Sequence, residues 1–253
     1  MKAIVYQMDV KWMDKEANLQ KIAEAASMNK GDIMVLPEMF NTGYIMHPEN
    51  GAEKENGSTI EAMKKISHDS GMLICGSIPL ESSVGATNSF VAVSDHGIEA
   101  RYDKIHLFTP SGEAKEYASG HETSVFSIGE WNIRPLICYD LRFPYVSSNK
   151  DKAFDVIIYC ANWPVARIQQ WRALLVARAI ENQCYVIGVN RVGTDENGYE
   201  YNGNSLIIDF KGNILADAGD REGIIEFELN KADLLDYRKS LPFLEDMKWP
   251  EFA

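Results

Sequence analysis

Several features that mark particular classes of protein are scarce or absent in this sequence. Only four of its 253 residues are cysteines, with no Cys-x-x-C pair and no histidine at ligand spacing, which argues against a disulfide scaffold or a zinc site. No stretch reaches the roughly 18 uninterrupted apolar residues that a membrane-spanning helix needs. The N-terminal segment becomes polar by Asp9, too early for a secretory signal peptide. We therefore expect a cytoplasmic protein with reduced thiols, no metal site and no membrane association.

Basic residues are also in deficit, at 25 Lys and Arg against 37 Asp and Glu, which gives a net charge of −12. Such a surface repels phosphate backbones and anionic lipids, so we expect neither nucleic acid nor membrane as a partner. A small anionic substrate is compatible with this charge, because one or two local arginines outweigh a distant field that salt screens. Without repeats or linkers, the ordinary globular composition predicts a single domain over residues 1–253.

Apolar runs of strand length alternate with helical periodicity along the chain. Helices are predicted over residues 14–28, 57–70, 142–150 and 166–182. Strands are predicted over residues 2–8, 33–36, 72–78, 89–93, 98–102, 131–138, 154–160, 184–189, 204–209, 213–217 and 223–228. Turn signals at 94–97 and 211–213 predict two hairpins, which argue against a purely parallel sheet. The pattern indicates a mixed α/β layered domain and does not decide between one sheet and two.

Reactive side chains follow several of these strands, and the first is Glu38. It comes after the 33–36 strand and Pro37, close to Phe40 and Tyr44, so its carboxylate would be partly desolvated and suited to act as a general base. The alternative is a glutamate in a solvated loop, since charged residues are usually exposed.

Lys104 follows the strand over 98–102, and Cys138 ends the strand over 131–138. A lysine in apolar company needs a negative partner, such as a developing oxyanion, unless it is a surface lysine with a buried stem. A cysteine before a helix start gains from the helix amides as a thiolate, unless it is an inert buried thiol. The backbone N–H of Tyr139 would then help to bind an oxyanion.

The strand over 154–160 is followed by Asn162, Trp163 and Arg167. An amide, an indole and a guanidinium near a helix start suit a pocket that recognises a carboxylate; alternatively, Arg167 is solvated and Trp163 belongs to the core.

The set of Glu38, Lys104 and Cys138 contains no histidine that could act as a base, so a carboxylate would have to activate the thiol. Neighbouring polar residues are interpreted as structural partners: His106, Asp140 and Arg142.

Three segments resemble the nitrilase superfamily of carbon–nitrogen hydrolases in order and spacing: LPE at 36–38, YDKIHL at 102–107 and ICYDLRFP at 137–144. The resemblance continues to the strand near 204–209 and covers nearly the whole chain. It implies a four-layer αββα sandwich with two mixed β-sheets, and a homodimer joined through the outer helix layers. It also implies a catalytic triad of Glu38, Lys104 and Cys138, with Glu113 as a second active-site glutamate.

Within this family the chain is most similar to bacterial omega-amidases, through MFNTGY at 39–44, ANWP at 161–164 and NRVG at 190–193. The resemblance implies hydrolysis of the terminal amide of 2-oxoglutaramate or 2-oxosuccinamate through a Cys138 thioester, without a cofactor. The residues expected to bind this small-molecule substrate are Phe40, Tyr44, Asn162, Trp163 and Arg167. Alternatives are the same chemistry on another amide, a nitrile or an N-carbamoyl compound, and a non-catalytic binding protein that retains the fold.

Overall fold

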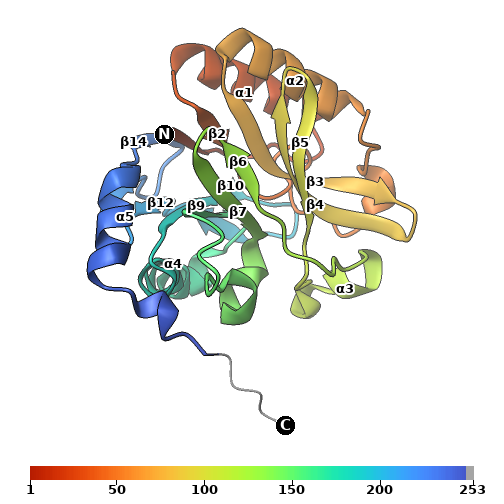
Figure 1. Ribbon diagram of the computed structural model, residues 1–253. Coiled ribbons are helices and arrows are strands. Elements are labelled where there is room, and N and C mark those ends of the chain that lie inside the picture. Colours follow the sequence, from red (N-terminus) through yellow and green to blue (C-terminus); the bar gives the residue numbers. More distant parts are fainter. Residues whose placement is uncertain (249–253) are drawn as a thin grey trace.

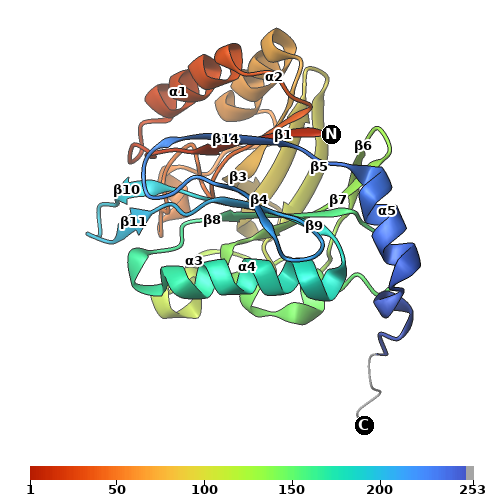
Figure 2. The same ribbon diagram turned by 90° about the vertical axis from the view of Figure 1, so that its left-hand side faces the viewer.

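Two six-stranded mixed β-sheets lie face to face in the computed structural model, which describes residues 1–248 (Figures 1 and 2). The first sheet contains, in spatial order, β14 (Gly223–Glu228), β1 (Lys2–Gln7), β2 (Ile33–Val35), β3 (Leu73–Ser82), β4 (Gly85–Ser94) and β5 (Gly97–Asp103). The second contains β13 (Ile214–Asp217), β12 (Leu206–Ile208), β9 (Tyr185–Asn190), β8 (Val156–Ala161), β7 (Trp131–Ile137) and β6 (Phe126–Ile128). Strands β1, β2 and β3 run parallel, as do β7, β8 and β9.

Helices cover the outer face of each sheet (Figure 2). α1 (Lys15–Met28) and α2 (Ser58–Ser70) lie over the first sheet, and α4 (Ile168–Asn182) lies over the second. The expected four-layer αββα sandwich is therefore confirmed.

The strands are apolar on both faces because each face is covered. On β1, Ala3 and Val5 point into the core between the two sheets, whereas Ile4 points into the core beneath α1 and α2. On β2, Ile33 points into the core between the sheets, and Met34 points into the core beneath the helices. Alternate side chains thus enter different cores, which explains the continuous apolar runs of the sequence.

Both predicted hairpins form. β4 and β5 are antiparallel and close with Ser94 opposite Gly97. β12 and β13 are joined by a turn in which Gly212 has a φ of +88°, a conformation that glycine adopts without steric cost. A third hairpin, which joins β3 to β4 with Ser82 opposite Gly85, was not predicted because the apolar runs stop short of the strand ends.

The helix predicted over 142–150 is wrong, because this segment forms two 3₁₀ turns, Cys138–Arg142 and Pro144–Ser147. Phe143 is extended between them (φ −112°, ψ 99°), since a proline disfavours the helical conformation of the residue before it. Short or polar elements were not predicted: α3 (Glu113–Glu116), α5 (Lys231–Ser240), β6, and the separate pair β10 (Val192–Thr194) and β11 (Glu200–Asn202).

Candidate active site

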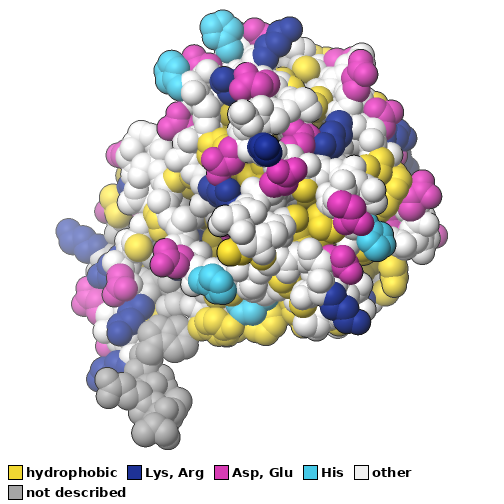
Figure 3. Space-filling view, turned by 90° about the vertical axis from the view of Figure 1, so that its right-hand side faces the viewer, with side chains coloured by type: hydrophobic (Ala, Val, Ile, Leu, Met, Phe, Trp, Pro, Cys, Tyr) yellow, Lys and Arg dark blue, Asp and Glu magenta, His cyan; other side chains and the backbone are white. Residues whose placement is uncertain are grey.

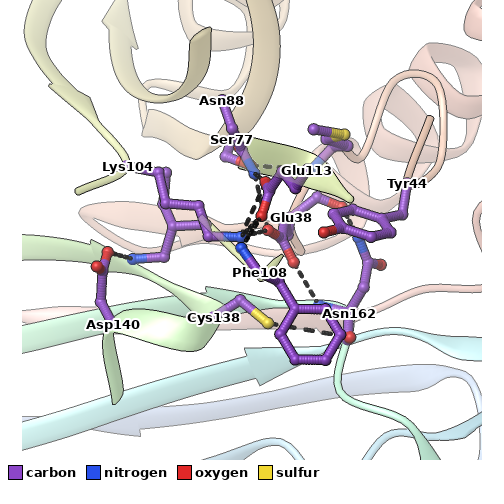
Figure 4. A network of polar contacts seen from close by, with 12 residues as sticks. Glu38, Tyr44, Ser77, Asn88, Lys104, Phe108, Glu113, Cys138, Asp140 and Asn162 are labelled. Carbon is purple, nitrogen blue, oxygen red and sulfur yellow. Dashed lines mark hydrogen bonds and ion pairs between the residues drawn. The ribbon is translucent and has the colours of Figure 1, made fainter. Parts of the chain in front are cut away.

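Three of the predicted residues meet where the two sheets end (Figure 4). Glu38 follows β2, Lys104 follows β5 and Cys138 follows β7. The Lys104 Nζ lies 2.8 Å from the Glu38 Oε1. Asn162, which follows β8, connects Glu38 to Cys138 through its backbone. Its N–H donates to Glu38 Oε2 at 2.9 Å, and its carbonyl oxygen lies 3.9 Å from the Cys138 Sγ. The fold thus brings together residues that are 34 to 100 positions apart in sequence.

Glu113 lies at the start of α3 and is completely buried. Its carboxylate oxygens accept from the Lys104 Nζ at 2.9 and 3.0 Å, and one of them accepts from the Phe108 N–H at 2.5 Å. Lys104 is therefore held between two buried carboxylates. Glu113 contacts the lysine and is not among the residues that line the cavity.

The pKa values of both proton donors in this cluster, Lys104 and Cys138, are raised, for different reasons. Burial opposes the charged form of Lys104, but Glu113 and Glu38 outweigh it and raise the pKa of this lysine well above its usual value. Burial raises the pKa of the Cys138 thiol well above its usual value; the Glu38 carboxylate adds to this and Lys104 opposes it. The expected gain of a thiolate from helix amides is thus outweighed, and the resting sulfur is a thiol that needs a base.

The turn that carries the cysteine is strained and firmly anchored. Cys138 has a φ of +44°, a left-handed conformation that costs a non-glycine residue about 1–2 kcal/mol. Asp140 accepts from the Ile137 N–H at 3.0 Å, the Tyr102 hydroxyl at 2.7 Å and the His106 N–H at 3.0 Å. The side chains of Asp140 and His106 also contact one another, so both have structural partners, as interpreted from the sequence.

A cavity of about 390 Å³ opens in front of the sulfur. Cys138, Tyr139 and four of the predicted binding residues line it: Tyr44, Asn162, Trp163 and Arg167. Phe40 does not, and its prediction as a pocket wall is wrong. Its side chain is completely buried against β3, where a Cβ added to Gly76 would lie 2.6 Å from the Phe40 ring.

Sequence reasoning missed Arg142 as a cavity residue. It lines the cavity with its guanidinium 4.9 Å from the centre of the Trp163 ring, and its Nη2 donates to Gln170 at 2.5 Å. A 3₁₀ turn has three residues per turn, so Tyr139 and Arg142 lie on the same side of it. The three-residue spacing between Tyr139 and Arg142 would have indicated Arg142 as a cavity residue, but only if the 3₁₀ turn had been predicted.

The hairpin of β10 and β11 forms another wall that the sequence did not indicate. Asp195, Asn197, Tyr199 and Tyr201 reach the cavity from this segment. The Asp195 carboxylate accepts from the Tyr201 hydroxyl at 2.9 Å and from two backbone N–H groups of its own loop, which fixes the loop shape.

No group of three or more His, Cys, Asp or Glu side chains within residues 1–248 is arranged to hold a metal ion. Among the helices of the same residues, none has the length and hydrophobicity needed to cross a bilayer.

The carbon–nitrogen hydrolase family model matches residues 2–239. The omega-amidase YafV of Yersinia enterocolitica is 42% identical over 97% of this chain and 96% of the relative. A 2-oxoglutaramate amidase of Bacillus subtilis is 32% identical over 96% of this chain and 95% of the relative. The crystal structure of XC1258 from Xanthomonas campestris, a CN-hydrolase superfamily protein with an arsenic adduct in its active site, matches with a TM-score of 0.94 and 32% identity, covering 100% of this chain and 99% of that one. This chain belongs to the carbon–nitrogen hydrolase family.

Proposed function

We propose that this protein is an omega-amidase that hydrolyses the terminal amide of 2-oxoglutaramate or 2-oxosuccinamate to the dicarboxylate and ammonia. One observation carries the proposal. A half-buried cysteine, backed by a buried carboxylate and lysine, lines a cavity together with two arginines, in a chain that is similar over almost its full length to omega-amidases and 2-oxoglutaramate amidases.

In the proposed mechanism, Glu38 accepts the Cys138 thiol proton while the sulfur attacks the amide carbon. The resulting oxyanion is stabilised by the Lys104 ammonium and the Tyr139 N–H. Glu113 serves this step by keeping Lys104 charged and in place, which its contacts of 2.9 and 3.0 Å support. Losing one such stabilising donor typically costs about 3–4 kcal/mol of barrier.

Glu38 then protonates the departing nitrogen, so that ammonia leaves and a Cys138 thioester remains. A water molecule gives a proton to Glu38 while its oxygen attacks the thioester carbon. When the second oxyanion collapses, the C–S bond breaks and Glu38 returns that proton to the sulfur, which releases the carboxylic acid product and regenerates the thiol. The raised pKa of Cys138 supports a general base over a preformed thiolate. These steps use only groups of the protein and water.

The 2-oxo acid end of the substrate carries a carboxylate, which needs a cationic partner. Arg167 is the residue expected from the sequence, and its guanidinium lies 5.4 Å from the centre of the Phe108 ring at the cavity wall. Arg142 is a second candidate on the same cavity. Tyr44 and Trp163 provide walls, and Asn162 contributes its backbone near the reacting carbon.

Incubation of the purified protein with 2-oxoglutaramate tests the function directly. We expect ammonia and 2-oxoglutarate in equal amounts from the wild type and neither from Cys138→Ala, whose circular dichroism should match the wild type. Turnover by Cys138→Ala would contradict the mechanism. Absence of turnover in the wild type would contradict the substrate and direct attention to nitriles, N-carbamoyl compounds and simple amides.

We also infer that the protein is a homodimer joined through its α4 and α5 side. Five exposed apolar residues lie on these elements and on the turns beside them: Tyr145, Ile180, Leu235, Leu241 and Phe243. Apolar area of this kind is typical of interfaces between subunits.

We place the activity in the cytoplasm, where thiols stay reduced. All four cysteines are unpaired, and the mechanism requires Cys138 as a free thiol. Fractionation of cells that produce the protein, followed by assay of each fraction, tests this location.

A further inference from the structure

A pair of polar side chains on β3 and β4 lies directly behind the buried carboxylates (Figure 4). The Nδ2 of Asn88 donates to Glu38 Oε1 at 2.8 Å and to Glu113 Oε1 at 3.1 Å, which uses both of its N–H groups. The Ser77 Oγ lies 2.9 Å from the Asn88 Oδ1. Both side chains are completely buried, and neither lines the cavity.

The donor and acceptor roles in this group are fixed by its ends. The Met39 N–H, which can only donate, is 2.9 Å from the Ser77 Oγ, so the Ser77 proton is free to go to the Asn88 Oδ1. The two carboxylates can only accept while ionised, so the Asn88 amide must turn its Nδ2 toward them. The chain of hydrogen bonds therefore runs in one direction, from the Met39 backbone to Glu38.

This chain of bonds holds Glu38 at two points. Asn88 binds its carboxylate, and Ser77 binds the backbone of Met39, the next residue. Met39 has a φ of +46°, a strained conformation that persists only when its surroundings enforce it. Asn88 and Ser77 thus hold Glu38 from the side of the first sheet, while Asn162 holds it from the second, where its Nδ2 donates to the Glu38 carbonyl at 3.0 Å.

The two oxygens of Glu38 are consequently unequal. Oε1 accepts from both Asn88 and Lys104, whereas Oε2 accepts from the Asn162 N–H. Because each carboxylate oxygen has two lone-pair sites, Oε2 keeps one available. The Asn162 carbonyl, in the same residue, is the group that the Cys138 Sγ contacts.

We propose that Asn88, supported by Ser77, is a positioning residue that turns Glu38 so that Oε2 is the oxygen that exchanges protons with Cys138 and the leaving nitrogen. The inference rests on the proposed amidase mechanism and adds the residue that orients its base. A structural alternative is that Asn88 only fills space between the strands and the carboxylates.

The substitution Asn88→Leu separates these readings, because it keeps size and neutrality and removes both N–H donors. The charged and titratable groups around this position are Glu38, Glu113, Lys104, Tyr44, Tyr117 and Cys138. Without the two donors, ionised carboxylates lose stabilisation and the protonated form is favoured. The acidic limb of the pH–rate profile should therefore move to higher pH.

Two assays measure the effect. The first follows kcat and KM on 2-oxoglutaramate against pH, and the second follows alkylation of Cys138 by iodoacetamide, since the other three cysteines are completely buried. For Asn88→Leu we expect kcat to fall by about 100-fold, the scale of a misplaced catalytic group, with KM little changed. Ser77→Ala should shift the profile in the same direction by less.

Asn149→Leu is the matched control. Asn149 is also buried and donates to the backbone carbonyls of Phe154, before β8, and Asn182, at the end of α4, at 3.0 and 3.1 Å. This variant should lose stability and keep the wild-type kcat and pH profile. An unchanged profile in folded Asn88→Leu, or the same shift in Asn149→Leu, would overturn the proposal.

If Asn88→Leu does not fold, Ser77→Ala decides, and an unchanged alkylation profile in that variant refutes the positioning role. If the wild type does not hydrolyse 2-oxoglutaramate, the proposed substrate fails, but the alkylation profiles still test Asn88.

Discussion

The Cys138 thiol is poorly suited to attack an amide without help. Its pKa is raised by burial and by the Glu38 carboxylate, so little thiolate exists at neutral pH before a substrate binds. Glu38 therefore has two opposite effects in the proposed mechanism. Its charge holds the proton on the sulfur at rest, and its oxygen removes that proton when the amide arrives.

These two effects predict different results for Glu38→Gln. Loss of the proton acceptor and donor should reduce amide turnover by at least the 10²- to 10⁴-fold that general acid–base catalysis typically contributes. Loss of the negative charge should lower the thiol pKa, so iodoacetamide should still label Cys138 at neutral pH. Parallel assays of turnover and labelling check this, and a variant that loses labelling along with turnover would contradict the assignment.

The two arginines of the cavity are distinguished by a comparison of substrates. Arg167→Ala should raise the KM for 2-oxoglutaramate by about 10- to 100-fold, because a hydrogen bond to a charged group contributes roughly 1.5–3 kcal/mol. Pentanamide, a neutral amide of the same chain length, should be affected little. Equal effects on both substrates would remove Arg167 from the carboxylate role, and the same pair of measurements on Arg142→Ala would show whether that residue fills it.

At the scale of elements, Glu53 links the two outer helices. Its carboxylate accepts from the Thr59 N–H at 2.9 Å near the start of α2, and pairs with Lys15 of α1 at 2.5 Å. Burial alone would raise the pKa of Glu53, but the Lys15 and Thr59 contacts outweigh it, and the pKa lies below the usual 4.5. The ionised carboxylate thus stabilises the packing of α1 and α2 above that pH.

We expect Glu53→Gln to lower the free energy of unfolding by about 2 kcal/mol at pH 7, the scale of a hydrogen bond to a charged group. The stability that Glu53 contributes is lost as the pH falls through its depressed folded-state pKa, so the difference between variant and wild type should shrink below pH 4.5. Urea denaturation at pH 7 and pH 4 measures this. Glu61→Gln, at an exposed pair with Lys64 on α2, is the control and should change stability by less than about 0.5 kcal/mol.

Most strands and the helices over 14–28 and 166–182 were predicted from their apolar patterns, and the helix over 57–70 was predicted from a polar stretch. The helix over 142–150 failed because Pro144 overrides the local pattern at Phe143. α5 was missed because its ten residues are mainly polar and bury only Leu234 and Arg238. Elements that a few long-range contacts stabilise leave little local signal in the sequence.

Some residues of the candidate site could likewise be predicted from the sequence, whereas others are recognised only in the structure. Glu38, Lys104 and Cys138 follow apolar strands, so both pattern and family motif indicate them. Asn88 lies within a strand, and only the pairing of β4 with β3 shows that it faces the carboxylates beside Ser77. The prediction that Phe40 lines the pocket was wrong, because its closeness to Glu38 in sequence does not show on which side of the loop its ring lies.

At the scale of the whole molecule, the charge opposes the proposed dimer. Each chain carries a net charge of −12, and acidic, basic and hydrophobic side chains are interspersed over the face in Figure 3. Two such chains repel one another at long range, and salt screens that repulsion over about 8–10 Å at physiological ionic strength. Association must therefore come from apolar burial, in an interface that typically covers about 1,600 Å² of polar and apolar surface together.

This balance predicts that the dimer strengthens with salt and fails when charge enters its apolar face. Ile180 on α4 and Leu235 on α5 are half exposed, at 51% and 50%. Ile180→Asp and Leu235→Asp should each shift the protein toward monomer in sedimentation velocity runs, because an unpaired carboxylate in an interface must be desolvated. Met28→Asp adds the same charge at the end of α1, in the opposite helix layer, and should leave the dimer intact. Dissociation by Met28→Asp but not by the other two would place the interface on the α1 and α2 side instead, and a wild-type monomer at every salt concentration would refute the dimer.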